Sequence, residues 1–223
     1  MPSDAMLAKL NKLHYKIADG DKKDKKKAIK KVDKLGYEIQ SAKRGVAHFK
    51  SKEPDGHSVV TVKGTNPHNA KDLLSDLNLA FGKQKKDKQF KHRTKEIKKI
   101  YSGVEGDKYL TGHSLGGSIV THAMTQSKSI RDNTAKASTF NAGYTPLFHQ
   151  SISQDKQVNK ELKKKLVNHH QKGDVISAAL TMNHVGQLKT QKKESNKAHS
   201  LDNFIKDKTL IDKQEPEDEE EPI

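Results

Sequence analysis

The stretch TGHSLGG contains the pattern Gly-x-Ser-x-Gly centred on Ser114. In many hydrolases this pattern forms a sharp turn between a strand and a helix, and the turn exposes the serine hydroxyl as a nucleophile. The flanking sequence meets that requirement, because KYLTG is strand-like and LGGSIVTHAM is helix-like. Gly112, His113 and Gly116 are assigned to the turn, where strand and helix crowd together. The pattern predicts nucleophilic attack by Ser114.

A serine hydroxyl becomes a good nucleophile only when a base takes its proton and an acid orients that base. In hydrolases of this kind the acid and then a histidine follow the serine in the chain. Asp174, in HHQKGDVIS, comes just after a predicted strand, and His199, in KAHSLDNFI, lies in a loop before a final apolar segment. The chain order therefore predicts Asp174 as the acid and His199 as the base.

Alternatives to this pair remain open at this point. His184 also follows Asp174 and is a second candidate for the base, while Asp155 and Asp202 are further candidates for the acid. His113 adjoins the nucleophile, but its side chain should point away from it. Chain order and loop context favour the first pair.

An attacked ester also needs donors for the oxyanion that develops on its carbonyl oxygen. The backbone N–H of Leu115, directly after the nucleophile, is the first predicted donor. Thr65, which follows the strand-like run VVTVKG, is the predicted second donor, since Gly64 permits a tight turn there. The alternative for Thr65 is a hydroxyl that only caps the turn.

Composition indicates a soluble protein that is made in the cytoplasm. The chain has 223 residues, of which 31% are hydrophobic and 32% charged, but the apolar residues gather into short runs typical of one folded domain. It has no cysteine, so the fold needs no disulfide. The first ten residues lack the features of a signal peptide, and no apolar run approaches the roughly 18 residues of a membrane span.

The net charge of +15 predicts attraction to anionic surfaces, including acidic phospholipid. The acidic end EPEDEEEPI carries six acids, so the rest of the chain is more basic still. Lysine greatly outnumbers arginine, and lysine lacks the planar guanidinium group with which arginine donates two hydrogen bonds to one base. Sequence-specific nucleic-acid binding is therefore disfavoured, and association with anionic membrane surfaces is favoured.

The chain divides into three predicted segments: residues 1–44, 45–210 and 211–223. The first carries two basic amphipathic helices, which pack on the domain or dock on a membrane. In the second, a hairpin formed by GVAHFKS and HSVVTVKGT is followed by helices over 66–82 and 88–104 and then by alternating strands and helices. This alternation predicts an α/β fold with a mostly parallel central sheet flanked by helices. The third segment is acidic and predicted to be disordered.

Several modest motifs in one order give the chain a family resemblance. The strand VVTVKGT, the helix DLLSDLNLAF, the turn TGHSLGG, the strand TFNAG, and the segments GDVIS and HSLDNFI resemble those of the class 3 lipases, the fungal triacylglycerol-lipase-like branch of α/β-hydrolases. The resemblance covers about residues 45–206. Lys63 stands where that family usually has arginine, and FNAGYTP replaces the commoner Gly-Ser/Ala-Pro.

The resemblance implies an α/β-hydrolase fold and hydrolysis of acylglycerols or phospholipids by Ser114, Asp174 and His199. Thr65 and Leu115 would hold the oxyanion, with no metal and no cofactor. Two rival hypotheses remain: a small-ester or thioester hydrolase, and a catalytically idle scaffold that binds membranes or nucleic acid through its charge. The chain also resembles lysine-rich lipase-like proteins of some large DNA viruses and virophages, which implies a virion-associated protein that helps to breach a host membrane. Intracellular use in a bacterium or a protist remains an alternative.

Overall fold

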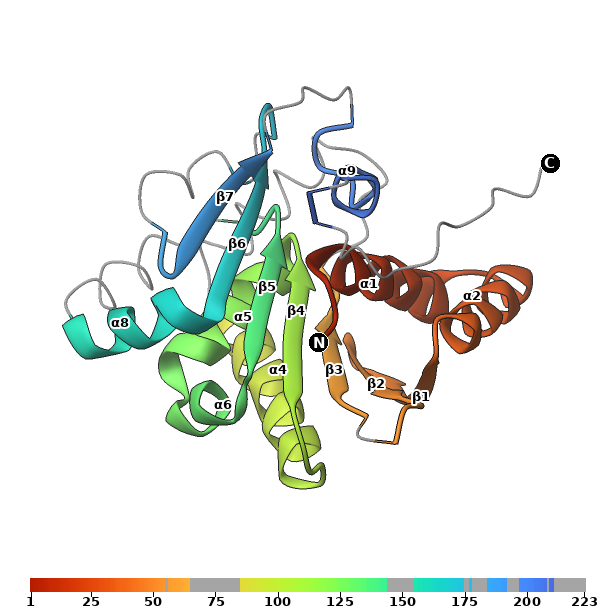
Figure 1. Ribbon diagram of the computed structural model, residues 1–223, viewed down its shortest axis with the longest axis horizontal. Helices are drawn as coiled ribbons and strands as arrows, with labels where there is room; N and C mark the ends of the chain where they lie inside the picture. Colours follow the sequence, from red (N-terminus) through yellow and green to blue (C-terminus); the bar gives the residue numbers. More distant parts are fainter. Residues whose placement is uncertain are drawn as a thin grey trace.

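The computed structural model describes residues 1–54, 56–64, 85–143, 155–174, 177, 184–191, 197–207 and 209–210. Within these residues, seven strands form one sheet whose spatial order follows the chain (Figure 1). The strands are β1 (Tyr37–Lys43), β2 (Val46–Ser51), β3 (Ser58–Val62), β4 (Lys108–His113), β5 (Lys136–Phe140), β6 (Leu166–Gln171) and β7 (Gln187–Gln191). The pairs β1–β2 and β2–β3 are antiparallel, and β3 to β7 run parallel. The predicted α/β fold with a mostly parallel sheet is confirmed.

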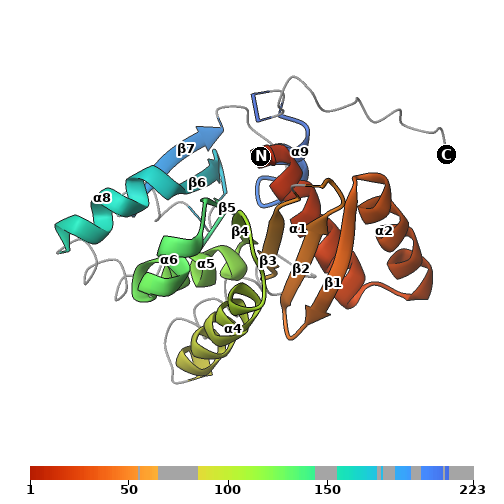
Figure 2. The ribbon, with the colours of Figure 1, turned by 60° about the horizontal axis from the view of Figure 1, so that its bottom comes forward.

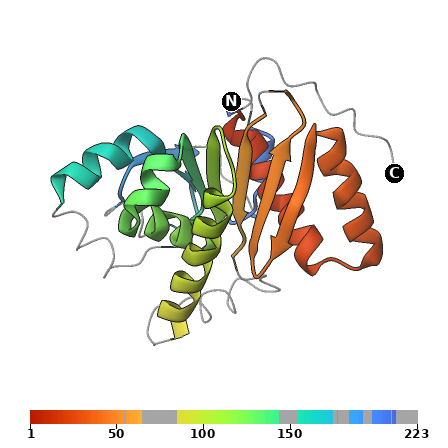
Figure 3. The ribbon, with the colours of Figure 1, turned by 90° about the horizontal axis from the view of Figure 1, so that it is seen from below.

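Helices cover both faces of the sheet. They are α1 (Asp4–Asp19), α2 (Lys22–Lys34), α4 (Lys85–Ser102), α5 (Leu115–Gln126), α6 (Lys128–Asn133), α8 (Lys156–Lys165) and α9 (Asp202–Ile205). Helices α4, α5, α6 and α8 contribute to one hydrophobic core, and α1, α2 and α9 contribute to the other. Figure 3 shows α4, α5 and α6 on the opposite side of the strands from α1 and α2.

Strand β3 and the middle of β4 carry apolar residues on both sides, and both of their faces are buried. Val60 and Val62 of β3 and Leu110 of β4 pack into the core beneath α4 and α5. The alternate residues Val59 and Tyr109 pack into the core beneath α1. This is why the sequence shows short continuous apolar runs where a half-exposed strand would show alternation.

Helix α1 docks on the sheet through polar as well as apolar side chains. Ser3 caps its N-terminus by accepting the Met6 N–H at 3.0 Å. Asn11 Nδ2 donates to Thr111 Oγ1 of β4 at 2.7 Å, and His14 Nδ1 lies 2.8 Å from Thr61 Oγ1 of β3. By contrast, α2 buries only Ala28 and Val32, and Figure 2 shows it at the β1 edge, away from β7 and α8.

Two edge strands and one boundary differ from the sequence prediction. No strand was expected at Tyr37–Lys43 or Gln187–Gln191, yet they form β1 and β7 at the two edges of the sheet. Both edge strands are mostly polar. In β1 the alternation of Tyr37 and Ile39 with polar residues ends at a register shift before Ser41, and β7 has one apolar residue, Leu188. The helix predicted over residues 159–168 spans Lys156–Lys165, because Leu166 begins β6.

Several predicted features lie outside the described residues. These are the helix over 66–82, the oxyanion donor Thr65 and the acidic end 211–223. In the part of the chain that is described, no helix combines the length and apolarity needed to cross a bilayer.

A buried carboxylate ties the start of α1 to the far strands of the sheet. Asp4 is 6% exposed. Its Oδ1 accepts from Ser138 Oγ at 2.6 Å and lies 2.7 Å from Lys136 Nζ, both on β5. Its Oδ2 lies 3.2 Å from His169 Nε2 on β6. Burial alone would raise the Asp4 pKa, but contacts with His169, Lys136 and Ser138 outweigh burial and hold the pKa well below its ordinary value.

Replacement of this carboxylate tests its contribution to stability. We expect Asp4→Asn to lower the free energy of unfolding at pH 7 by about 3 kcal/mol, because it leaves buried partners uncompensated. Since the folded-state pKa is depressed, the stabilisation is complete above about pH 4 and declines as the pH falls below that value. Urea unfolding at pH 7 and pH 3 should therefore show a smaller acid-induced loss in Asp4→Asn than in the wild type.

A matched control removes an exposed carboxylate. Asp33 pairs with Lys52 at 2.5 Å in solvent, and exposed pairs contribute little. Asp33→Asn should leave the unfolding curve unchanged. An Asp4→Asn protein as stable as Asp33→Asn would contradict the anchoring role of Asp4.

Candidate active site

The nucleophile candidate Ser114 lies in a strained turn between a strand and a helix. Strand β4 ends at His113 and α5 begins at Leu115, as the sequence predicted. Ser114 has φ 56° and ψ −127°, a left-handed φ that costs energy in a residue with a side chain. Such strain persists only where the surroundings enforce it. The turn therefore holds the serine in one defined orientation at the carboxyl end of β4.

Two glycines allow the close approach that forms this turn. A Cβ atom on Gly116 would lie 2.0 Å from the Val62 carbonyl oxygen, and one on Gly112 would lie 2.4 Å from the Gly116 carbonyl oxygen. Neither contact leaves room for a methyl group. Backbone therefore packs directly on backbone where β3, β4 and α5 meet.

One of the two predicted oxyanion donors, Leu115, lies at the same edge. Leu115 is the first residue of α5, and the first N–H groups of a helix have no acceptor within it. Gly64 comes close to this group, since a Cβ atom on Gly64 would lie 3.1 Å from Leu115 N. Parallel pairing of Val62 with Gly112 aligns the ends of β3 and β4. Thr65 follows Gly64 directly in the chain and lies outside the described residues.

The predicted acid and base are joined by a hydrogen bond. His199 Nδ1 lies 2.9 Å from Asp174 Oδ1. Asp174 is 3% exposed, and its other oxygen accepts both the hydroxyl and the backbone N–H of Ser177. An ionised carboxylate can only accept, so Nδ1 carries the proton and Nε2 of a neutral His199 has a free lone pair. The pair thus has the orientation of a base held by an acid.

The ionisation of Asp174 suits this arrangement. Burial favours the neutral acid, but hydrogen bonds from His199 and Ser177 stabilise the carboxylate and bring the net pKa of Asp174 below its ordinary value. The acid is therefore charged at neutral pH.

The loop that carries His199 packs against the turn that carries Ser114. The rings of His113 and His199 lie 4.7 Å apart between centroids, and His113 immediately precedes Ser114. Ser114 Oγ and His199 Nε2 are both buried, and neither has a hydrogen-bond partner among the described residues. Within the described part of the chain, these two atoms from neighbouring segments thus make no hydrogen bond.

Side chains at the ends of β4 and β5 hold two consecutive carbonyls of the base loop. His113 Nε2 lies 2.8 Å from the His199 oxygen, and Asn141 Nδ2 donates to the Ala198 oxygen at 2.8 Å. Asn141 Oδ1 also accepts the Gln171 N–H, at the end of β6, at 2.9 Å. Asn141 has φ 44°, so this connection is strained as well. The asparagine links the acid and base segments.

These supporting roles were not predicted from the sequence. The one available signal was FNAG in place of the commoner Gly-Ser/Ala-Pro, which marks Asn141 as unusual without giving its partners. No sequence pattern indicated that Ser177 would bond Asp174 or that the His113 side chain would contact the loop that carries His199.

The alternative residues occupy other places. His184 is exposed. Asp155 caps the N-terminus of α8 by accepting the N–H groups of Gln157 and Val158. Asp202 lies in the first turn of α9 and is bonded to Lys12. The structure therefore brings His199 and Asp174 together and pairs neither with these alternatives.

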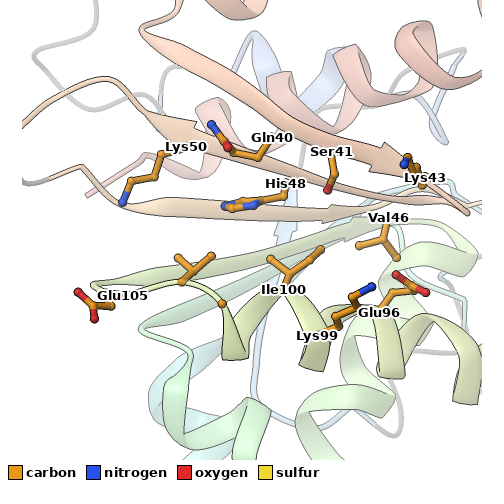
Figure 4. A pocket seen from close by; sticks show the side chains of 12 residues that line it. Gln40, Ser41, Lys43, Val46, His48, Lys50, Glu96, Lys99, Ile100 and Glu105 are labelled. Atoms are coloured by element: carbon orange, nitrogen blue, oxygen red, sulfur yellow. The ribbon is translucent and has the colours of Figure 1, made fainter.

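A cavity of about 700 Å³ lies elsewhere, between β1, β2 and α4. Figure 4 shows His48 and Lys50 on one side of it and Ile100 and Glu96 on the other. None of its lining residues belongs to the turn, the acid or the base. It is not the place where Ser114 would meet a substrate.

Comparisons with known proteins show the family and the fold of the chain. A phospholipase-like family model, the Tle-like phospholipase domain, matches residues 15–213. The crystal structure of M37 lipase is similar in fold, with a TM-score of 0.50 and 13% sequence identity over 76% of this chain and 68% of that chain. No curated protein matches the chain in sequence. The chain has the α/β-hydrolase fold.

The tight glycine contact gives a direct test of the turn. We expect Gly116→Ala to destabilise the protein by about 3 kcal/mol or more, because the new methyl group overlaps the Val62 carbonyl. Thermal unfolding would measure the loss. Gly103→Ala is the matched control, since a Cβ atom there would lie no closer than 3.8 Å to its neighbours. Equal melting temperatures for the two variants would contradict the packing described above.

Proposed function

The chain belongs to the family of Tle-like phospholipase domains, and on that premise we propose that it hydrolyses carboxylic esters of lipids with Ser114 as nucleophile. The observation that carries the proposal is the His199–Asp174 hydrogen bond in a loop packed on the turn that bears Ser114. The three residues follow the chain order of a Ser-Asp-His triad on an α/β-hydrolase scaffold.

In the proposed mechanism, Ser114 Oγ attacks the ester carbonyl carbon while His199 Nε2 takes its proton. The charged Asp174 stabilises the resulting imidazolium. The N–H of Leu115 and a donor from Thr65 hold the oxyanion of the tetrahedral intermediate. Collapse transfers the proton to the leaving alcohol and gives an acyl-enzyme. A water molecule, activated by the same histidine, then releases the fatty acid and restores the serine.

We propose phospholipid, cleaved as by a phospholipase A, as the substrate class, with triacylglycerol as the alternative. Both are carboxylic esters that one acyl-enzyme mechanism can serve. The family match favours phospholipid. We also propose that the site is laid out as the resemblance to class 3 lipases implies, with Thr65 and Leu115 as the oxyanion donors.

An active-site probe tests the nucleophile. We expect a fluorophosphonate to label the folded wild type and to leave Ser114→Ala unlabelled, because only an activated serine reacts. Phosphatidylcholine vesicles should yield free fatty acid and lysophospholipid in equal amounts by mass spectrometry, and Ser114→Ala should yield neither. The control is Ser129→Ala, an exposed serine of α6, which should react like the wild type.

The outcomes separate the rival functions. Labelling without lipid products would indicate a hydrolase of small esters or thioesters. Absence of labelling in a folded wild type would defeat the proposal and leave a binding scaffold. Release of a phosphorylated headgroup would point to phosphodiester cleavage and also contradict it.

We also propose that the cationic surface directs the protein to anionic membranes. Helix α2 carries eight lysines and buries only Ala28 and Val32. The turn before it lies at the edge that bears Ser114, because Asp19 pairs at 2.7 Å with Lys63, which directly precedes Gly64. A bilayer attracted by α2 would therefore lie close to this edge. Each lysine near an anionic surface contributes on the order of 1 kcal/mol.

Charge reversal on α2 tests this orientation. We expect replacement of Lys23, Lys26 and Lys30 by Glu to lower the rate on phosphatidylserine-containing vesicles by about tenfold or more at low salt. The rate on a soluble short-chain ester should not change, and high salt should abolish the difference between variant and wild type.

The matched control reverses three exposed lysines on the other face of the molecule: Lys160, Lys163 and Lys164 of α8. This variant has the same net charge as the α2 variant. An equal loss of rate in both would show that total charge, and not the position of α2, governs attraction.

A further inference from the structure

The residue before the nucleophile is held in one tautomer by its surroundings. His113 Nε2 lies 2.8 Å from the His199 carbonyl oxygen, which can only accept a hydrogen bond, so Nε2 carries a proton. Burial, helped by the nearby His199, lowers the pKa of His113 to about 3. The imidazole is therefore neutral at physiological pH, and its Nδ1 is an acceptor.

Tyr15 of α1 supplies the donor that this acceptor requires. Its hydroxyl lies 3.2 Å from His113 Nδ1, and its ring meets the imidazole edge-on at 5.8 Å between centroids. Burial raises the pKa of Tyr15, so the hydroxyl keeps its proton and donates it. The same oxygen accepts the backbone N–H of Gly64 at 2.7 Å.

Three hydrogen bonds thus run in one direction across the site. The chain passes from the Gly64 N–H to the Tyr15 hydroxyl, from that hydroxyl to His113 Nδ1, and from His113 Nε2 to the carbonyl of His199. Its two ends are the residue before the predicted oxyanion donor Thr65 and the backbone of the predicted base. Gly64 fits closely here, since a Cβ atom on it would lie 2.9 Å from the Tyr15 hydroxyl and 2.8 Å from the His113 carbonyl oxygen.

We infer that Tyr15 and His113 are positioning residues, which fix the main chain of Gly64 and of His199 relative to Ser114. The inference rests on the proposed function for its catalytic consequence, but the hydrogen-bond chain itself is testable without it. Loss of the Tyr15 hydroxyl removes the donor that fixes the His113 tautomer and the acceptor that holds Gly64. The base and the oxyanion donor should both lose their alignment, which lowers turnover more than substrate binding.

The kinetic test uses substitutions that keep ring size. We expect Tyr15→Phe and His113→Phe each to lower kcat by about tenfold or more, with KM nearly unchanged. If the two act through one chain, the loss of kcat in Tyr15→Phe/His113→Phe should be smaller than the product of the two single losses. Multiplying effects in the double variant, or an unchanged kcat in Tyr15→Phe, would overturn the inference.

Tyr37→Phe is the matched control. The Tyr37 hydroxyl also bonds a histidine nitrogen, His57 Nε2 at 2.8 Å, but on the edge strand β1. This variant should keep the wild-type kcat. A similar loss in Tyr37→Phe and Tyr15→Phe would indicate general loosening of the fold and would also overturn the inference.

An activity-independent readout separates this inference from the proposed function. NMR of the labelled histidines should show the His113 Nε2–H exchanging slowly with water in the wild type. We expect exchange at least tenfold faster in Tyr15→Phe and unchanged in Tyr37→Phe. A wild type that neither labels nor hydrolyses lipid would defeat the proposed function alone, whereas unaltered exchange in Tyr15→Phe would defeat the positioning chain.

Discussion

The direct contact between the backbones of Gly116 and Val62 is the constraint on which the rest of the site depends. Because no side chain separates them, the first turn of α5 sits on the end of β3. The turn between β4 and α5 must then be sharp, and Ser114 takes a left-handed φ as a result. The same closeness brings the Leu115 N–H beside Gly64. One steric requirement thus places the predicted nucleophile, Ser114, beside a predicted oxyanion donor.

The predicted base, His199, is held differently, through hydrogen bonds to the main chain of its loop. The carbonyls of Ala198 and His199 accept from Asn141 and His113, which stand at the ends of adjacent parallel strands. His113 of β4 pairs with Phe140 of β5, the residue before Asn141. The side chains of His113 and Asn141 therefore lie at the same edge of the sheet. The loop therefore gains part of its position from the sheet.

The parts of the fold with strong local signals could be predicted from the sequence. The β2–β3 hairpin, the strand and helix around Ser114 and the location of Asp174 after a strand follow from apolar runs, glycines and chain order. The edge strands β1 and β7 could not be predicted, since an edge strand buries little and needs few apolar residues. Tyr15 could not be placed at the site either. Its role depends on contacts with residues 49 and 98 positions later.

The anchoring of α1 by Asp4 also constrains the order in which the chain can fold. Asp4 and its partner Ser138 are 134 residues apart, and His169 lies further on. Because synthesis runs from the N-terminus to the C-terminus, α1 is made before β5 and β6, and Asp4 cannot acquire its buried partners until both strands exist. Helix α1, which also carries Tyr15, therefore completes its contacts only after most of the sheet has been made.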